Sequence, residues 1–387
     1  MNPIWKFAPL CEAVEICDSL RKPINSKERN ARIEGKAQSE LYPYYGATGQ
    51  VGFIDDYITD GEYVLLGEDG APFLNTFAQK AYLISGKSWV NNHAHILCSK
   101  GNNRFLCYYL NYFNYKGYVS GTTRLKLTQA QMKTIPVPVP SVEEQERIVA
   151  RIEELFSELD NGVETLRKTK QQLAVYRQAV YASVYGTADL RPITDFFDIS
   201  GGLTKNSKRH ELPIKMPYLR VANVYYNELD LSEIKYIGVT ENEVGRTLLQ
   251  KDDLLFVEGN GSKEQIGRVA IWDGSVENCL HQNHLIKGRP IGGMLPQFAL
   301  YYLISRYGRK QILDVASSTS GLYTLSTNKV RNLKIPYVDI EQQRKCIATI
   351  EARISVCDSI EKTVDTALQQ AEAMRQSILK KAFEGRL

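Results

Sequence analysis

Two short segments of this 387-residue sequence contain residue types that could do chemistry, but neither has the spacing that its chemistry needs. Residues 81–88 match a loose Walker A pattern, yet bulky apolar residues stand where a phosphate requires a pliant glycine loop opening a helix. His93 and His95 stand at alternate positions, which share one face of a strand, and could hold a metal together with Cys98, but no partner pair of ligands occurs elsewhere. We therefore expect no catalytic residue, no metal and no cofactor on this chain.

Positive charge is concentrated in two stretches. Residues 21–36 carry six basic and two acidic side chains, and residues 205–220 carry five basic and one acidic. Residues 143–168, by contrast, carry eight acidic and four basic side chains. A single basic stretch is usually a solvated face, but two stretches at matching places indicate contacts with phosphates. The small net charge of +4 averages over these regions.

Several glycine-containing loops carry side chains that can read base edges or hold phosphates. They are residues 42–49, 67–70, 120–124, 258–262 and 317–323. Turn chemistry alone explains any single one of them. The candidate DNA-contacting residues are Lys22, Lys27, Arg29, Arg32, Tyr44, Tyr45, Thr48, Glu68, Asp69, Asn91, Asn92, Thr122, Thr123, Arg124, Lys205, Lys208, Arg209, Arg220, Asn223, Asn260, Ser262, Lys263, Gln282, Asn283, Ser318, Ser320 and Tyr323.

The elements that must position these residues come from a duplication. Residues 143–178 match residues 341–376 at 12 of 36 positions, at an offset of 198. Upstream, Ser120-Gly121 and Ile135-Pro136 match Ser320-Gly321 and Ile335-Pro336 at an offset of 200, which predicts two extra residues in the first proline-rich segment. The chain is a tandem repeat of a variable module followed by a helix.

Each copy ends in a long helix with a seven-residue apolar repeat. About four heptads indicate a coiled coil, with proline marking each start. In the second copy Ile360, Ala367 and Met374, three residues further on, are expected to complete the seam. The seam residues are Ile152, Leu159, Leu166, Leu173, Val180, Ile350, Cys357, Val364, Ala371 and Ile378. An antiparallel pair of such helices, each roughly 60 Å long, would join the two modules.

The modules are predicted to be α+β. Strands are expected at residues 63–66, 253–257 and 268–272, and amphipathic helices at 105–113 and 297–307. No run of about 18 apolar residues occurs, and seven scattered cysteines show no CxxC pair, so we expect a cytoplasmic protein without disulfides.

In this order, duplicated, several segments resemble the specificity subunit of type I restriction–modification systems, and the resemblance covers the whole chain. The segments are YPYYGATGQVGFID (42–55), LLGEDG (65–70), WVNNHAHIL (89–97), IPVPVPSVEEQERIVARIE (135–153), LFVEGNGSKEQIGRVAIWDG (255–274), QNHLIKGRP (282–290), KIPYVDIEQQRKCIATIE (334–351) and SILKKAFEGRL (377–387). The resemblance implies target recognition domains at 1–137 and 188–335. It implies a central helical region at 138–187 and a C-terminal one at 336–387, with pseudo-two-fold symmetry.

The resemblance also implies a function. Such a subunit is not catalytic: each recognition domain reads one half of a split double-stranded DNA target, and the helices set the gap between the halves. The helices dock two modification subunits, which bind S-adenosylmethionine and methylate adenine. Restriction and translocase subunits, which use ATP and Mg²⁺, join that core.

Two alternatives remain. The chain could be the recognition part of a fused methyltransferase, but Asn2-Pro3-Ile4-Trp5 only faintly resembles the Asn-Pro-Pro-Tyr motif, and no glycine-rich cofactor motif occurs. It could also be a coiled-coil scaffold without DNA specificity, which would leave the matched basic stretches unexplained.

Overall fold

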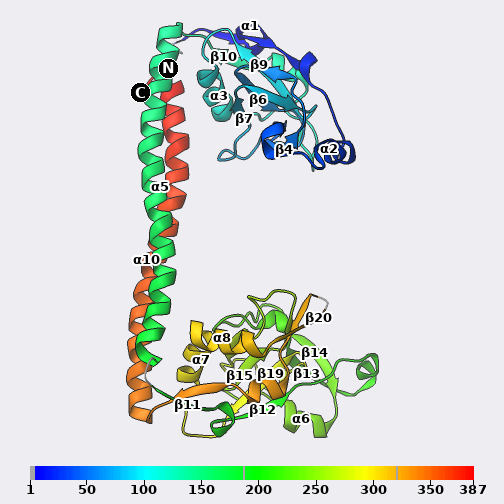
Figure 1. Ribbon diagram of the computed structural model, residues 1–387, viewed down its shortest axis with the longest axis vertical. Helices are drawn as coiled ribbons and strands as arrows, with labels where there is room; N and C mark the ends of the chain where they lie inside the picture. The colour runs from blue at the N-terminus through cyan, green and yellow to red at the C-terminus, as the bar shows by residue number, and fades with distance from the viewer. Residues whose placement is uncertain (1–4, 186–187, 320) are drawn as a thin grey trace. The chain divides into compact units, whose positions relative to one another are not determined.

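The computed structural model describes residues 5–185, 188–319 and 321–387. Its contacts divide the chain into two units. Unit 1 is Met1–Lys168 with Thr363–Leu387, and unit 2 is Thr169–Lys362. Each unit combines one globular part with a portion of both long helices (Figure 1). The four domain boundaries given by the sequence stay a prediction.

Unit 1 has two four-stranded sheets, ordered β2-β9-β6-β7 and β4-β3-β8-β5, and a pair β1-β10. Its strands are β1 (Phe7–Pro9), β2 (Val14–Ile16), β3 (Tyr42–Gly46), β4 (Gly49–Ile54), β5 (Thr59–Asp60), β6 (Tyr63–Gly67), β7 (Ala81–Ile84), β8 (Lys87–Val90), β9 (Ala94–Ser99) and β10 (Pro136–Pro138). Its short helices are α1 (Leu10–Ala13), α2 (Ser26–Ile33), α3 (Asn103–Tyr112) and α4 (Gln129–Lys133), with 3-10 turns η1 (Asp18–Leu20) and η2 (Gln38–Glu40).

Unit 2 has a four-stranded sheet, β12-β19-β15-β17, two three-stranded sheets, β14-β13-β18 and β16-β21-β20, and a pair β11-β22. Its strands are β11 (Asp189–Pro192), β12 (Phe197–Gly201), β13 (Ile214–Leu219), β14 (Lys235–Val239), β15 (Leu254–Val257), β16 (Gly259–Asn260), β17 (Val269–Ile271), β18 (Leu280–His281), β19 (Leu285–Pro290), β20 (Ser317–Thr319), β21 (Leu322–Thr324) and β22 (Lys334–Tyr337). Its short helices are α6 (Glu241–Thr247), α7 (Pro296–Ile304), α8 (Arg306–Val315) and α9 (Thr327–Arg331), with 3-10 turns η3 (Ile193–Asp195), η4 (Ser207–Glu211) and η5 (Val221–Asn223).

In each unit an aromatic helix packs on a four-stranded sheet, which is β2-β9-β6-β7 in unit 1 and β12-β19-β15-β17 in unit 2. In unit 1, Asn102 caps α3 by accepting the Phe105 N–H at 3.0 Å, and Phe105, Tyr109 and Leu110 are buried against the sheet and the long helices. The single helix expected at 297–307 is wrong. There α7 ends at Ile304, and Ser305 caps a new helix, α8, by accepting the Gly308 N–H.

The two copies are related by one offset of 198 residues as far back as their last strands. The Leu10 N–H donates to the Ile135 carbonyl at 2.8 Å, and the Ile193 N–H donates to the Leu333 carbonyl at 2.9 Å. Ile135 and Leu333 are 198 residues apart, so the predicted offset of 200, with its two extra residues, is wrong. Proline matches in a proline-rich segment misled the sequence comparison. Residues 198 apart in these segments are called equivalent below.

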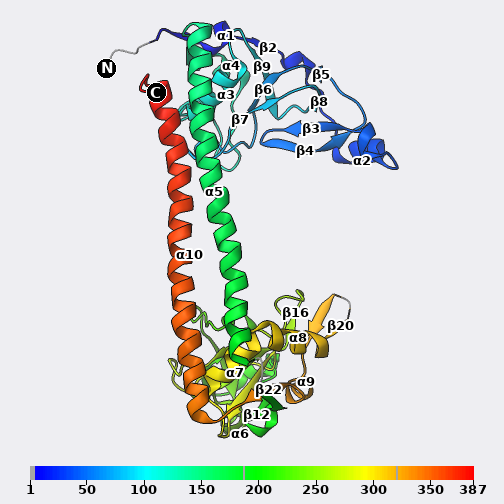
Figure 2. The ribbon, with the colours of Figure 1, turned by 60° about the vertical axis from the view of Figure 1, so that its left-hand side comes forward.

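The long helices α5 (Val142–Tyr185) and α10 (Ile340–Phe383) each run for 44 residues. They lie side by side in opposite directions within each unit (Figures 1 and 2). In unit 1, Ile148 and Ile152 at the start of α5 share a core with Leu379 and Phe383 at the end of α10. In unit 2 the end of α5 and the start of α10 share the core in the same way.

All ten predicted seam residues are buried or half-buried. The predicted second position is wrong at Ile360 and Met374, however, because both are exposed, whereas Ala367 is half-buried. Half-buried residues lie instead four positions after each seam residue. They are Phe156, Val163, Lys170 and Arg177 in α5 and Ile354, Glu361, Leu368 and Arg375 in α10. The seam therefore alternates steps of four and three residues.

Equivalent residues make reciprocal ion pairs. In unit 1 Arg375 pairs with Asp160, and in unit 2 Arg177 pairs with Asp358 at 2.6 Å. Because Arg177 is equivalent to Arg375 and Asp160 to Asp358, each copy contributes the same acid and the same base.

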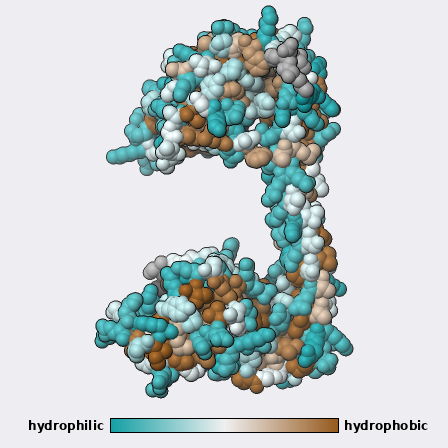
Figure 3. All heavy atoms as spheres, turned by 180° about the vertical axis from the view of Figure 1, so that it is seen from behind, coloured by the Kyte–Doolittle hydropathy of each residue, from teal (hydrophilic) through white to brown (hydrophobic). Residues whose placement is uncertain are grey.

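Among the described residues, no helix is long and apolar enough to cross a membrane. Figure 3 shows hydrophilic residues over much of the visible surface, interrupted by smaller hydrophobic patches.

Candidate nucleic-acid interface

Three loops of unit 1 that are far apart in the sequence converge at the end of β6 and the start of β9. The Glu68 N–H donates to the His93 carbonyl at 2.8 Å, and the Leu127 N–H donates to the Glu68 carbonyl at 2.8 Å. The Gly70 N–H donates to the Leu125 carbonyl at 2.8 Å. Residues 68–70, 91–93 and 120–127, three of the segments that the sequence singled out, thus form one surface.

Unit 2 repeats this arrangement. The Glu258 N–H donates to the His284 carbonyl at 2.9 Å, and the Leu325 N–H donates to the Glu258 carbonyl at 2.7 Å. Leu325 is equivalent to Leu127. Residues 258–262, 282–284 and 317–325 are therefore joined by the same two backbone links, and we call the surface in each unit its loop cluster.

Ion pairs join the tips of the unit 1 loop cluster. Arg124 Nε lies 2.7 Å from Asp69 Oδ1, and His93 Nδ1 lies 3.6 Å from Asp69 Oδ2. Lys126 Nζ lies 3.5 Å from Glu68 Oε1. Asn92, Thr122, Thr123 and Arg124 are exposed, so polar donors and acceptors face solvent here.

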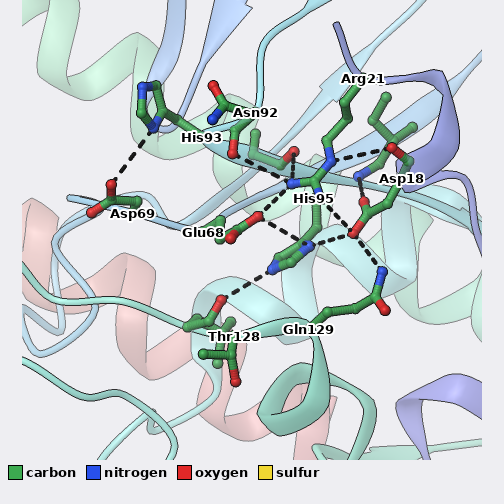
Figure 4. Close-up of polar contacts among 12 residues, drawn as sticks. Asp18, Arg21, Glu68, Asp69, Asn92, His93, His95, Thr128 and Gln129 are labelled. Carbon is green, nitrogen blue, oxygen red and sulfur yellow. Dashed lines mark hydrogen bonds and ion pairs between the residues drawn. The ribbon is translucent and has the colours of Figure 1, made fainter. Parts of the chain in front are cut away.

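A buried charge network lies beneath this loop cluster (Figure 4). His95 is fully buried, with Nδ1 2.7 Å from Asp18 Oδ2 and Nε2 3.1 Å from the Leu127 carbonyl oxygen. Both ring nitrogens therefore lie against oxygen atoms of other segments, one of η1 and one of the loop before α4. Arg21 pairs with Asp18 at 3.1 Å and also with Glu68.

The network fixes the loop backbone. The Arg21 guanidinium donates to the carbonyls of Asn92 and Ala94, at 3.4 and 3.3 Å. Burial alone would raise the pKa of Asp18, but the contact with His95, the Gln129 amide and the Ile96 N–H lower it below its ordinary value. Asp18 is thus held ionised as the acceptor at the centre of the network.

The central residue differs in unit 2. In unit 1 Leu66 of β6 is opposite His95, next to the pair Gly67 and Ala94 at the loop cluster. In unit 2 the pair next to Val257 and Leu285 is Phe256 opposite Ile286. Ile286 is buried, so apolar packing replaces the charge network there.

Two tandem α/β parts with equivalent loop clusters, joined by paired helices, match a known family. The model of the type I restriction modification DNA specificity domain matches residues 10–173 and 187–370. This chain belongs to that family.

Several relatives have related names. The chain is 26% identical, over 69% of its length, to the EcoKI specificity subunit of Escherichia coli K12, of which it spans 61%. It is 25% identical, over 95% of its length, to a putative type I restriction enzyme specificity subunit of Haemophilus influenzae, of which it spans 92%. The chain therefore spans under two thirds of the first of these relatives and most of the second.

Solved structures have the same fold. A chain of a type I R-M system superposes with a TM-score of 0.72 at 16% identity, covering 100% of this chain and 99% of that one. The HsdS subunit of Thermoanaerobacter tengcongensis superposes with a TM-score of 0.56 at 16% identity, covering 100% and 98%.

The first basic stretch, residues 21–36, consists of α2 and its flanking segments, and α2 contacts strand β4 of the sheet β4-β3-β8-β5. Lys22 and Arg32 lie over the ring of Trp89, 5.5 and 5.1 Å from its centroid, and Arg29 lies over Tyr44. Arg32 also pairs with Asp55 at 2.6 Å. Lys22, Lys27 and Thr48 are exposed, and Tyr45 is half-buried.

Four predicted contacts are wrong because the side chains are buried. Tyr44 is 3% exposed, and its hydroxyl faces the Ile24 carbonyl. Asn223 is 2% exposed and donates to the carbonyls of Asp230 and Glu233. Asn91 is also buried, with its amide oxygen accepting the His93 N–H.

Arg209 is the fourth. It is 9% exposed and makes two hydrogen bonds to Glu243, at 3.1 and 2.7 Å. These bonds, together with the Thr240 N–H, lower the pKa of Glu243 to about 2. A basic residue in a basic stretch thus became half of a structural ion pair, which composition could not reveal.

The remaining unit 2 candidates are accessible. Lys205, Lys208, Lys263 and Ser318 are exposed. Arg220 pairs with Glu233 at 2.8 Å, and Asn260 accepts the Ser262 N–H at 2.9 Å. Gln282, Asn283 and Tyr323 are partly exposed in the unit 2 loop cluster. Ser320 lies outside the described residues.

The sequence reading missed Asp18 and His95 as a pair. In the described parts of the chain, no group of three or more His, Cys, Asp or Glu side chains could hold a metal ion. Of the three residues considered as metal ligands, His95 is instead bound to Asp18. A histidine inside an otherwise apolar strand was the available signal, but its partner depends on how β9 meets η1.

Proposed function

We propose that this chain is the DNA-binding specificity subunit of a type I restriction–modification complex, with each loop cluster reading one half of a gapped target. The observation that carries the proposal is the repeated pair of backbone links, Glu68 to His93 and Leu127, and Glu258 to His284 and Leu325. One scaffold presents exposed polar side chains twice, as two half-sites would require.

Exposed cations of both units would hold the DNA backbone. Lys22, Lys27 and Lys126 in unit 1 and Lys205, Lys208 and Lys263 in unit 2 are exposed. Lysine contacts to phosphate position a protein on DNA without reading bases, and their strength falls with salt. We therefore assign base reading to the loop tips and positioning to these lysines.

The paired helices would set the gap between half-sites and dock two modification subunits. Both helices run uninterrupted through residues of unit 1 and unit 2, and equivalent residues pair reciprocally. The relatives of this chain are named as specificity subunits of type I restriction enzymes. Methylation and ATP-dependent cleavage would belong to partners that bind S-adenosylmethionine, ATP and Mg²⁺, and this chain would act in the cytoplasm without a cofactor.

The gap can be tested by shortening both helices by one heptad. Removing residues 166–172 and their equivalents 364–370 keeps the heptad phase of each helix and shortens each by about 10 Å. Full-length chain with its modification subunit would select gapped sites from a random DNA pool, before and after the deletion.

We expect the deletion to shorten the gap by about three base pairs, because DNA rises about 3.4 Å per base pair. The half-site sequences should stay the same. Altered half-sites with an unchanged gap would contradict the spacer role. A motif without any gap from the undeleted chain would contradict the proposed function itself.

A further inference from the structure

Arg124 stands out in the unit 1 loop cluster because, in the described part of the chain, its guanidinium is paired through Nε alone. Its side chain is 60% exposed, and its Nε lies 2.7 Å from Asp69 Oδ1. Among the described residues, neither Nη group has a hydrogen-bond or ion-pair partner. Both Nη groups therefore remain available as donors to a ligand.

The surrounding backbone holds this side chain in place. Ser120 and Lys126 exchange two backbone hydrogen bonds, of 3.0 and 2.8 Å, which close the loop that carries Arg124. Gly70 packs beneath it: a Cβ at Gly70 would lie 3.2 Å from Arg124 Nε. A guanidinium held in advance loses less entropy when it binds.

The neighbouring acid decides between two ligands. Arginine binds phosphate through charge, but here the Asp69 carboxylate already pairs with the guanidinium, whereas Glu68 of the same loop is paired with Arg21 and Lys126. A phosphate at Arg124 would meet repulsion from the Asp69 carboxylate. A guanine edge is uncharged and presents two acceptors, O6 and N7, in the major groove, which two arginine donors match.

We propose that Arg124, positioned by Asp69, reads a guanine in the half-site of unit 1. This inference rests on the proposed function. The corresponding place in unit 2 lacks both the arginine and the acid. Asp69 is β-paired with Lys126, and Gly259 is β-paired with Thr324, the equivalent of Lys126, so Gly259 stands where unit 1 has Asp69. Leu322, equivalent to Arg124, is 49% exposed and offers no donor. The two half-sites therefore differ at this base pair.

The test uses full-length chain with its modification subunit and a random DNA pool. The wild type should select a fixed guanine at one position of the unit 1 half-site. Arg124→Leu and Arg124→Lys should both lower the preference for that guanine by about 5- to 150-fold, because lysine keeps the charge but lacks the planar fork. Asp69→Asn should weaken the same preference.

Lys126→Ala is the matched control, because it removes a charge from the same loop. It should weaken binding to all sequences alike and reduce the salt slope by about one. Replacing the selected guanine by 7-deazaguanine should impair the wild type but cost Arg124→Leu nothing further. Unchanged base preferences at the other positions of the unit 1 half-site show that unit 1 of each variant is folded.

Uniform weakening by Arg124→Leu, with base preferences unchanged, would overturn the inference and make Arg124 a phosphate contact. A wild-type unit 1 half-site without a guanine would overturn it as well. Both results still include a gapped motif. Failure of the proposed function is different, because the wild type would then select no gapped motif.

Discussion

Units 1 and 2 have the same loop backbone, but different residues are buried beneath it. In unit 1 these residues are charged or polar, with His95 buried between Asp18, Glu68 and the Leu127 carbonyl. In unit 2 Ile286 takes that place and packs with Phe256 in an apolar core. The backbone links between loops are nevertheless the same. The scaffold thus depends on strand register and backbone hydrogen bonds, and side chains on and beneath it can differ between units.

The largest effect is expected from removing the acid at the centre of the buried charge network of unit 1. Asp18→Ala should destabilise unit 1 by about 3–5 kcal/mol, because it removes the hydrogen-bonded partner of the buried His95 and leaves Arg21 with Glu68 as its only acid among the residues described. Adding His95→Ile, the residue of unit 2, should recover part of this loss. Denaturant unfolding measures the effect, and hydrogen exchange of the β9 and β19 amides assigns it to a unit. Equal loss of protection in both strands would contradict the comparison.

Between pH 7 and pH 5 we expect unit 2 to lose stability through one buried histidine. His281 is fully buried, with Nδ1 2.9 Å from the Thr247 carbonyl, and burial lowers its pKa to about 3. Below about pH 6.5 the unfolded chain binds a proton that the folded chain excludes, so stability falls by about 1.4 kcal/mol per pH unit toward pH 3.

Unfolding free energies at pH 7.0, 6.0 and 5.0 would measure this slope. His281→Leu should flatten it, whereas His210→Asn, at an exposed position of the same unit, should not. A slope that survives His281→Leu would show that another group is responsible.

A third prediction concerns a feature that the units share. Gln145 accepts the Asn102 N–H at 2.9 Å, and its equivalent Gln343 accepts the Leu295 N–H at 2.8 Å, each at the start of an aromatic helix. Both glutamines are buried. Gln145→Met and Gln343→Met should each cost about 1–3 kcal/mol, because each leaves a backbone N–H unsatisfied. Calorimetry of both variants checks this, and a loss in one variant only would break the equivalence.

The smallest effect is expected in the helices. Arg177→Ala and Arg375→Ala should each cost about 1 kcal/mol or less, because both pairs are partly exposed. Comparable small losses, measured by thermal unfolding, would show that the helices are the part in which the copies agree most. A loss of several kcal/mol in one variant would contradict this.

Most of the fold could be predicted from local patterns in the sequence. The duplication, both 44-residue helices and the strands β6, β15 and β17 are confirmed. Residues seven positions apart lie on the same face of a helix, so the apolar seam could be recognised from its spacing in the sequence. The second seam position was not, because Ile360 and Met374 are apolar yet exposed, whereas the half-buried Glu361 and Arg375 are charged.

The site was harder to predict for a physical reason. Loop residues 68–70, 91–93 and 120–124 could be named from composition, but whether they meet depends on strand register. The same holds for Asp18 and His95, which lie 77 residues apart. Arg209 and Asn223 show the opposite error, because charge and polarity cannot distinguish a structural partner from a DNA contact.

The central claim is that two unlike loop clusters read two unlike half-sites. Mapping methylated adenines in the genome of cells that contain this chain and its modification partner tests it most directly. We predict one asymmetric motif, made of two different half-sites separated by a gap of fixed length. A continuous motif, a palindrome or methylation without any motif would contradict the account.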